Sequence, residues 1–218
     1  MNELTIFEQD FQTKYIQRKL RVYDINVLDP LQTIFEIMCY DHTVSGFTSE
    51  LTEEVLYDTL VRYNHFPLYI TTNFDAKMED EMDLLERLKS RPFVCHEHPR
   101  YEGDHRRTSF YCCIEVLNAN DLRFVLKESF FRAAYSETFL ITFARPTFEL
   151  KTSGQWIFKE VKYTHVVDVL DGLPFILPSH DALGFMWFSN GDAFQNVDQL
   201  KLILPTDYQI DHVLNSYE

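Results

Sequence analysis

FELKTSGQWIFKEV, residues 148–161, is the stretch that most directly indicates the fold. Two runs rich in aromatic and β-branched residues flank the polar segment Thr152-Ser-Gly-Gln, and this arrangement is typical of a β-hairpin. We therefore predict a hairpin that turns at Gly154. Because hairpins join antiparallel strands, the segment favours an antiparallel sheet over a doubly wound parallel one.

Residues on either side of this hairpin extend the predicted sheet. Aromatic and β-branched runs separated by polar breaks predict strands over residues 66–72, 108–117, 138–144, 165–170 and 184–189. Apolar positions at helical spacing predict helices over residues 78–88 and 122–135, and from Asp192 to Leu204. A sheet with helices packed on it follows from this pattern.

The first third of the chain has a different pattern. Phe7, Phe11 and Tyr15 recur every four residues, and residues 31–39 place apolar side chains at helical spacing after Asp29-Pro30. A third helix is predicted from about Thr52 to Asn64. The expected fold is α+β: one domain, residues 1–218, with a helical N-terminal layer (1–64) packed on a mainly antiparallel sheet with further helices (65–218).

The chain is strongly acidic. Its 218 residues include 34 acidic and 20 basic side chains, a formal charge of −14. Such a charge repels the phosphates of nucleic acids and anionic membrane surfaces, so neither is an expected partner. It attracts and steers a basic protein. The alternative interpretation is that the charge serves solubility alone.

Sequence features also bear on compartment. No apolar run reaches the roughly 20 residues that a membrane-spanning helix needs. The N-terminal residues do not have the basic and apolar regions of a secretory signal. The four cysteines show no disulfide framework, which favours a reducing compartment. A cytoplasmic protein is expected.

Several common catalytic and cofactor motifs are absent from the sequence. The six glycines are too widely spaced for G-x-G-x-x-G or a P-loop, which need close glycines to bring backbone amides against phosphates. The chain also contains no G-x-S-x-G, H-E-x-x-H or C-x-x-C. Dinucleotide binding, P-loop chemistry and thioredoxin-like redox chemistry are therefore not expected.

One polar segment has the residue types of a metal site. His96, His98 and His105 fall within ten residues, and on an extended chain His96 and His98 share a face. Together with His105, Asp104 or Glu102, they could hold zinc or manganese with an open water position, as catalytic zinc requires. The alternative is a polar surface loop.

The same segment has three arginines. Arg100, Arg106 and Arg107 could bind a phosphate or carboxylate, because a guanidinium matches both groups in a bidentate geometry. The alternative is that Arg106 and Arg107 protect the exposed edge of a strand.

Two further groups of residues have weaker signals. His180-Asp181 and His165 include acid–base side chains, yet no motif places a nucleophile beside them, so structural roles are preferred. Trp156 and Trp187 are candidate interface residues, because tryptophan concentrates binding energy. The alternative for both tryptophans is a place in the core.

Two functional hypotheses result. The first is an acidic cytoplasmic binding protein without catalytic activity or cofactor, such as an inhibitor or immunity-type partner of a basic protein. The second is a metal-dependent hydrolase that uses His96, His98 and His105 with zinc or manganese. Charge supports the first hypothesis, and the histidine cluster supports the second.

Overall fold

The computed structural model describes most of the chain. It covers residues 2–9, 14–22, 25–27, 33–75, 79–89, 93–99, 108–135, 138–155, 158–167, 173–189 and 194–214. Within these segments, no helix is long and apolar enough to cross a membrane.

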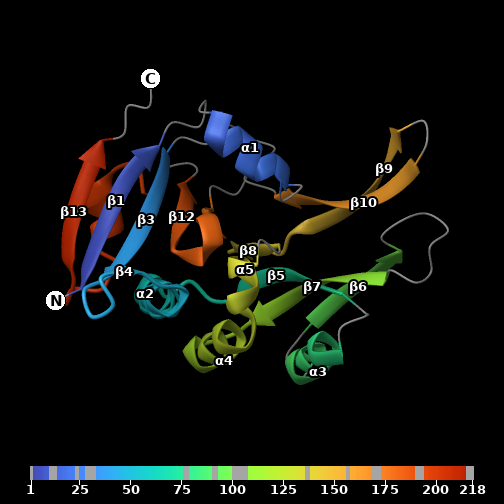
Figure 1. Cartoon of the computed structure of the whole chain (residues 1–218), viewed down its shortest axis with the longest axis horizontal. Coiled ribbons are helices and arrows are strands. Elements are labelled where there is room, and N and C mark those ends of the chain that lie inside the picture. The colour runs from blue at the N-terminus through green and yellow to red at the C-terminus, as the bar shows by residue number, and fades with distance from the viewer. Residues whose placement is uncertain are drawn as a thin grey trace.

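A ten-stranded mixed sheet forms the centre of the molecule (Figure 1). Its order is β13 (Gln209–Leu214), β1 (Glu3–Gln9), β3 (Thr33–Asp41), β12 (Gly184–Ser189), β11 (Phe175–Pro178), β8 (Phe139–Thr142), β5 (Leu68–Asp75), β7 (Thr108–Val116) and β6 (Phe93–Pro99), with β4 (Gly46–Phe47) paired to β3. β13 runs parallel to β1, and the other neighbours along this path are antiparallel. The first and last described strands therefore pair with each other.

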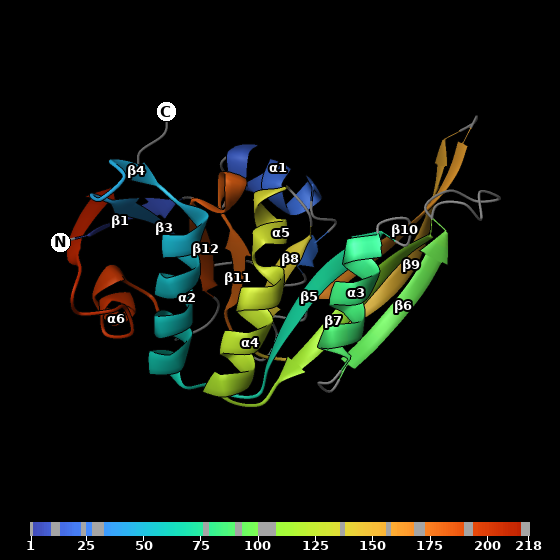
Figure 2. The same ribbon diagram turned by 60° about the horizontal axis from the view of Figure 1, so that its bottom comes forward.

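Helices and a small second sheet cover the two faces of this sheet. Figure 2 shows α2 (Ser49–Tyr63), α4 (Ala119–Ser129) and α3 (Glu79–Leu88) side by side on one face. The other face carries α1 (Lys14–Val22) and a three-stranded sheet of β2 (Ile25–Val27), β10 (Phe158–Val167) and β9 (Thr147–Gln155). Two short helices complete the fold, α5 (Phe131–Ala134) after α4 and α6 (Val197–Lys201) before β13.

Apolar side chains fill both faces of the sheet. The larger cluster lies on the side of α2, α3 and α4 and includes Phe35, Leu56 and Trp187. The smaller cluster packs Ile16 of α1 against strand residues such as Ile34. Ile34 and Phe35 are neighbours in β3, yet both are fully buried, because this strand is covered on both faces.

The predicted helical N-terminal layer is wrong. Residues 3–9 form β1 and residues 33–41 form β3, so both belong to the sheet. β3 resembles a helix in sequence because burial on both faces removes the alternation that marks a half-exposed strand. The helix predicted from the spacing of Phe7, Phe11 and Tyr15 is also wrong at its start. Phe7 lies in β1, and the helix of this region is α1, Lys14–Val22. Phe11 and Asp29-Pro30 lie outside the described residues.

The helix predicted from about Thr52 to Asn64 is present as α2, which begins slightly earlier. Thr48 caps its N-terminus, where Oγ1 accepts a hydrogen bond from the Leu51 amide at 3.2 Å. Asn64 ends the helix in the left-handed conformation at φ 51°, which asparagine tolerates better than most residues. Both caps are polar residues that favour these positions, so local sequence determines the bounds of α2.

The predicted hairpin is formed by β9 and β10, but its turn lies elsewhere. Gly154 is within β9 and pairs with Lys159, so the strands continue past the predicted turn, as far as the pair of Gln155 and Phe158. The strand predicted over residues 165–170 is the end of β10, up to Val167. The helix predicted from Asp192 is the short α6, capped by Asn196.

A close approach between β12 and β3 requires glycine at position 184. A Cβ atom on Gly184 would lie 2.3 Å from the Ile37 carbonyl oxygen, which is a severe clash. Gly184 begins β12 and pairs with Met38. The residue therefore allows β12 to join the centre of the sheet.

Candidate functional site

An acidic row runs along the outer surface of α2. Glu50, Glu54 and Asp58 are four residues apart, so they lie on one side of the helix. Glu50 and Glu54 are exposed and Asp58 is half-buried. Glu50 is in the first turn, where the helix dipole favours a carboxylate, but like charges at this spacing destabilise a helix by a few tenths of a kcal/mol per pair, so helix stability does not explain Glu54 and Asp58. We call Glu50, Glu54 and Asp58 the acid row.

The turn before β13 adds to the acid row. Burial raises the pKa of Tyr208 to about 12, and the neighbouring carboxylates of Asp207, Glu54 and Asp58 contribute to that rise. A phenol next to three carboxylates resists losing its proton, since the phenolate would be a further negative charge. Asp207 is exposed and Tyr208 is half-buried, so the ring lies at the surface among acidic groups. The acid row, Asp207 and Tyr208 together form the acidic surface.

Basic side chains of α4 lie beside α2, next to Glu53. Burial raises the pKa of Glu53, with smaller contributions from Glu54 and Glu50, and the nearby Arg123 and Lys127 of α4 oppose that rise. The Arg123 guanidinium lies over the Tyr57 ring, 3.5 Å from its centroid. The side of α2 that faces α4 therefore has balanced charge.

Fewer basic groups offset the negative charge of the acidic surface than offset that of Glu53. Among the described residues, the ion pairs found do not include Glu54, Asp58 or Asp207. Arg62, in the last turn of α2, follows Asp58 by four residues on this side of the helix, and its guanidinium donates to the Thr206 hydroxyl at 3.4 Å. A net negative, partly aromatic surface results, which is suited to a cationic ligand.

The predicted metal-binding histidines are only partly located. His96 and His98 lie on β6 at the edge of the sheet, opposite Tyr111 and Ser109 of β7. As alternate residues of a strand they share a face. His105 lies outside the described residues, as do Asp104 and Glu102. Among the described residues, no group of three histidine, cysteine or acidic side chains is close enough to hold a metal.

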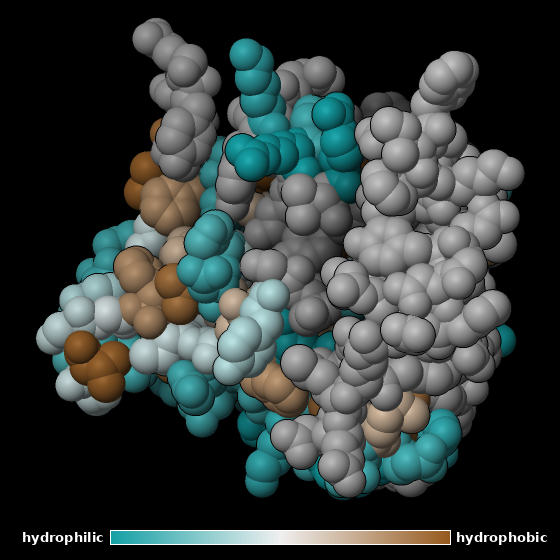
Figure 3. Space-filling view, turned by 45° about the vertical axis from the view of Figure 1, so that its right-hand side comes forward, coloured by the Kyte–Doolittle hydropathy of each residue, from teal (hydrophilic) through white to brown (hydrophobic). Residues whose placement is uncertain are grey.

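The other predicted site residues are divided between the core and undescribed segments. Arg100, Arg106, Arg107 and Trp156 all lie outside the described residues. Trp187 is fully buried, with its ring 5.4 Å from that of Tyr63, so its place is in the core. On the face drawn in Figure 3, the described hydrophobic residues form small groups separated by hydrophilic ones.

The turn between β11 and β12 does not assemble a catalytic relay. His180 Nδ1 lies 2.8 Å from the Asp181 carboxylate, with both side chains largely exposed. Ser179 donates its hydroxyl proton to Glu36 at 2.8 Å, and Gln9 donates to the same carboxylate at 3.0 Å. The serine is therefore used in a hydrogen-bond cluster rather than held by the histidine. His165 lies on β10 opposite Phe148.

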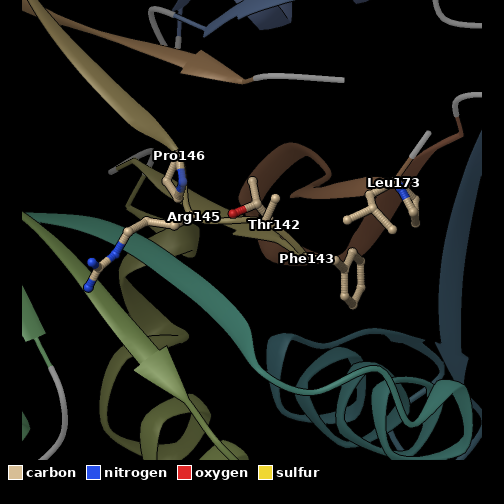
Figure 4. A pocket seen from close by; sticks show the side chains of 7 residues that line it. Thr142, Phe143, Arg145, Pro146 and Leu173 are labelled. Carbon is tan, nitrogen blue, oxygen red and sulfur yellow. The ribbon is translucent and has the colours of Figure 1, made fainter. Parts of the chain in front are cut away.

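One small pocket lies where β8 ends. Thr142, Phe143, Arg145, Pro146 and Leu173 line it together with Ala144 and Pro174 (Figure 4). Its volume of about 10 Å³ is the space of one water molecule. Arg145 extends away from Phe143 and Leu173, and its guanidinium lies 5.9 Å from the Tyr69 ring centroid. The pocket is too small to be a substrate site.

Sequence reasoning missed the acidic surface, although half of its signal was present. Glu50, Glu54 and Asp58 can be recognised at four-residue spacing once α2 is predicted. Asp207 and Tyr208 cannot be placed beside them from sequence alone, because that neighbourhood depends on β13 pairing with β1. No local pattern predicts such a long-range parallel pair.

Comparison of the chain with protein-family models, curated proteins and solved structures finds no match.

Proposed function

We propose that this chain is a non-catalytic cytoplasmic binding protein that recognises a basic protein through the acidic surface. The supporting observation is the acid row with Asp207 around Tyr208, which joins negative charge to an aromatic side chain. Tyrosine is enriched among residues that carry binding energy, and complementary charge speeds association. An inhibitor or immunity-type partner of a basic protein fits this description.

The electrostatics support a surface role for these carboxylates. The formal charge of −14 attracts a cationic partner at long range, and the acidic surface gives that attraction a location. Carboxylates that are exposed and without ion pairs can engage lysine or arginine without first losing an internal partner. The partner therefore needs a cluster of basic side chains with room beside it for an aromatic ring.

The test is affinity capture with matched charge variants. The immobilised full chain is incubated with native lysate at low salt, and retained proteins are eluted with rising salt. The wild type should retain a protein of basic isoelectric point that salt releases, because screening weakens exposed charge pairs. Glu54→Gln with Asp58→Asn should lose most of this retention.

Asp83→Asn with Glu86→Gln is the matched control, because it removes the same charge from exposed residues of α3. This control should retain the protein as the wild type does. Equal loss in both double variants would assign binding to net charge alone. Retention of no basic protein by the wild type would contradict the proposal.

The metal-dependent hydrolase is a second candidate, supported by the shared face of His96 and His98 on β6. If it is correct, purified protein retains about one equivalent of zinc or manganese, the stoichiometry of a single catalytic site. His96→Ala then loses the metal, as elemental analysis would show. Metal-free protein whose melting is unchanged by a chelator would contradict this candidate.

A further inference from the structure

β13 is the outermost strand at one end of the large sheet (Figure 1). Among the described residues, it pairs with β1 alone, in a continuous parallel register from Gln209 to Leu214. Sheet edges are usually protected by lysine, proline, a bulge or a covering loop, because their free backbone groups can pair with another chain. The sequence of β13, QIDHVL, contains neither lysine nor proline. This edge therefore has the properties of a site for strand addition.

The backbone groups on the outer side of β13 belong to alternate residues. The Gln209 amide donates to the carbonyl oxygen of Asn2 at 3.2 Å, so Gln209 directs its backbone groups toward β1. Residues two apart in a strand direct their N–H and C=O groups to the same neighbour, and the residues between them direct theirs to the other side. The residues of β13 that point these groups away from β1 are therefore Ile210, His212 and Leu214. We call their N–H groups the outward amides.

We propose that the basic partner adds an extended strand antiparallel to β13 and places lysine or arginine side chains against the acidic surface, an inference that rests on the proposed function and specifies the form of the partner. Strand addition takes its affinity from main-chain hydrogen bonds and its specificity from alternate side chains. The antiparallel direction is expected because antiparallel pairing is somewhat more stable per residue than parallel pairing. The outward amides of β13 then donate to carbonyl groups of the added strand.

The acidic surface lies at the start of this edge. Asp207 and Tyr208 directly precede β13, and Tyr208 is close enough to Glu54 and Asp58 for their charges to raise its pKa. Tyr208 and Ile210 both pack against the larger core cluster, on the face of the sheet that α2 covers. A residue of the added strand opposite either of them shares that face, so a basic side chain there points toward the acid row.

The other face of β13 also selects side chains. Asp211 is exposed, and Val213, two residues further along the same face, is 39% exposed. Directly opposite residues of neighbouring strands interact, so a cation opposite Asp211 and an apolar side chain opposite Val213 are favoured. A second copy of the chain is a poor occupant, because two formal charges of −14 would repel each other. The expected occupant is an extended segment that is basic at one end and apolar at the other.

The probe is a capped peptide, Thr-Val-Thr-Lys-Lys-Thr-Lys, titrated into the isotope-labelled full chain at low salt and followed by NMR. In the proposed register its valine lies opposite Val213, its first two lysines lie opposite Asp211 and Ile210, and its last lysine lies opposite Tyr208. Hydrogen exchange at the outward amides should slow when the peptide binds. Exchange at Gln209 should change little, because that amide is already bonded on the side of β1. An absence of binding would overturn the proposal.

Two methylated forms of the peptide provide a matched control. N-methylation of the third and fifth residues removes N–H groups that face β13 in this register, whereas N-methylation of the second and fourth removes N–H groups that face away. The first form should bind at least about tenfold more weakly than the unmodified peptide, because two backbone hydrogen bonds are lost. The second form should bind as the unmodified peptide does. Equal affinity of the two forms, or the reverse order, would overturn the proposal.

A pair of substitutions at one position tests the same point on the protein. His212→Pro removes a central outward amide and should weaken peptide binding, since proline is tolerated on an edge strand where its missing N–H would face solvent. His212→Ala keeps that amide and should bind the peptide as the wild type does. Both variants lose the imidazole, which lies 3.5 Å from the Glu8 carboxylate, so this contact does not distinguish them. Equal binding by the two variants would contradict strand addition. If His212→Pro does not fold, the methylated peptides still decide the question.

Charge variants separate this proposal from the proposed function. Glu54→Gln with Asp58→Asn should weaken peptide binding more than Asp83→Asn with Glu86→Gln does, and selective loss on methylation should remain. Charge-dependent binding that both methylated peptides retain would overturn strand addition and leave the acidic surface as the binding site. Methylation-sensitive binding that ignores the acid row would contradict the proposed function instead. A dimer by light scattering, with the outward amides already protected, would assign this edge to a second copy and overturn the proposal.

Discussion

The two long sides of α2 differ in whether their carboxylates lie near basic or near acidic groups. On the side of α4, Glu53 lies near Arg123 and Lys127, and Arg123 also covers the Tyr57 ring. On the side of β13, Glu54 and Asp58 lie near a third carboxylate, Asp207. The first arrangement stabilises the fold. The second adds repulsion, so it is the side on which a binding role is the better explanation.

The largest effect is expected from the buried face that both sides of α2 share. Leu56 is 1% exposed and lies in the larger core cluster. Leu56→Ala should lower the free energy of unfolding by about 2–5 kcal/mol, the usual cost of a core cavity. Urea denaturation followed by circular dichroism measures this loss.

Val44→Ala is the control for Leu56→Ala, because Val44 is 60% exposed in the turn between β3 and β4. It should change stability by less than about 0.5 kcal/mol. Similar losses in both variants would show that α2 does not anchor on the sheet as described, and the comparison of its two sides would then lose its basis.

A smaller loss is expected on the side of α4. Arg123→Ala removes a cation positioned 3.5 Å from the Tyr57 ring centroid, a contact worth about 0.5–1 kcal/mol at an exposed site. It should also raise the pKa of Glu53 further, because the Arg123 charge lowers that pKa in the wild type. Denaturation and carbon-detected NMR titration measure the two effects. An unchanged Glu53 titration would contradict the described contact.

A change of opposite sign is expected on the side of β13. Glu54 has Glu50 and Asp58 four residues away on either side, so Glu54→Gln removes two like-charge pairs. Stability should rise by about 0.5 kcal/mol at low salt, and the gain should shrink as salt screens the charges. Denaturation midpoints at two ionic strengths provide the measurement. A destabilised variant would show that Glu54 makes a stabilising contact within the fold, which would contradict the proposal that it serves a binding partner.

The sequence predicts those elements of the fold whose determining residues are close to one another along the chain. The bounds of α2 follow from Thr48 and Asn64, which act within one helical turn, and the β9–β10 hairpin is likewise formed by neighbours along the chain. β3 was misassigned because burial on both faces depends on α1 and α2, which are packed there by the tertiary fold. Local periodicity contains no information about such covering layers.

The candidate sites show the same limit. The spacing of the acid row and the shared face of His96 and His98 can be derived from sequence. The proximity of Asp207 to Glu54 requires the pairing of β13 with β1. That pairing depends on which strands become neighbours in the sheet, and that choice is made by the whole core.

An effect confined to alkaline pH is expected in the titration of Tyr208. Its pKa of about 12 is above the ordinary value of 10, so its protonated form is favoured by folding. The corresponding stability is fully present below pH 10 and is lost as pH rises through about 12, since the unfolded state releases the proton first. Tyr208→Phe should therefore make the alkaline loss of stability shallower between these values.

The contribution of the acidic surface to that shift can be isolated. Burial is the largest cause of the raised pKa, and Glu54 is one of the smaller ones, so Glu54→Gln should lower the pKa of Tyr208 only in part. Phenolate absorbance at high pH, taken as the difference between each protein and its Tyr208→Phe counterpart, isolates this tyrosine from the other eleven. Asp83→Asn on α3 should leave the difference curve unchanged. If both variants shift it equally, the effect arises from net charge, and the acidic surface is not a distinct electrostatic unit.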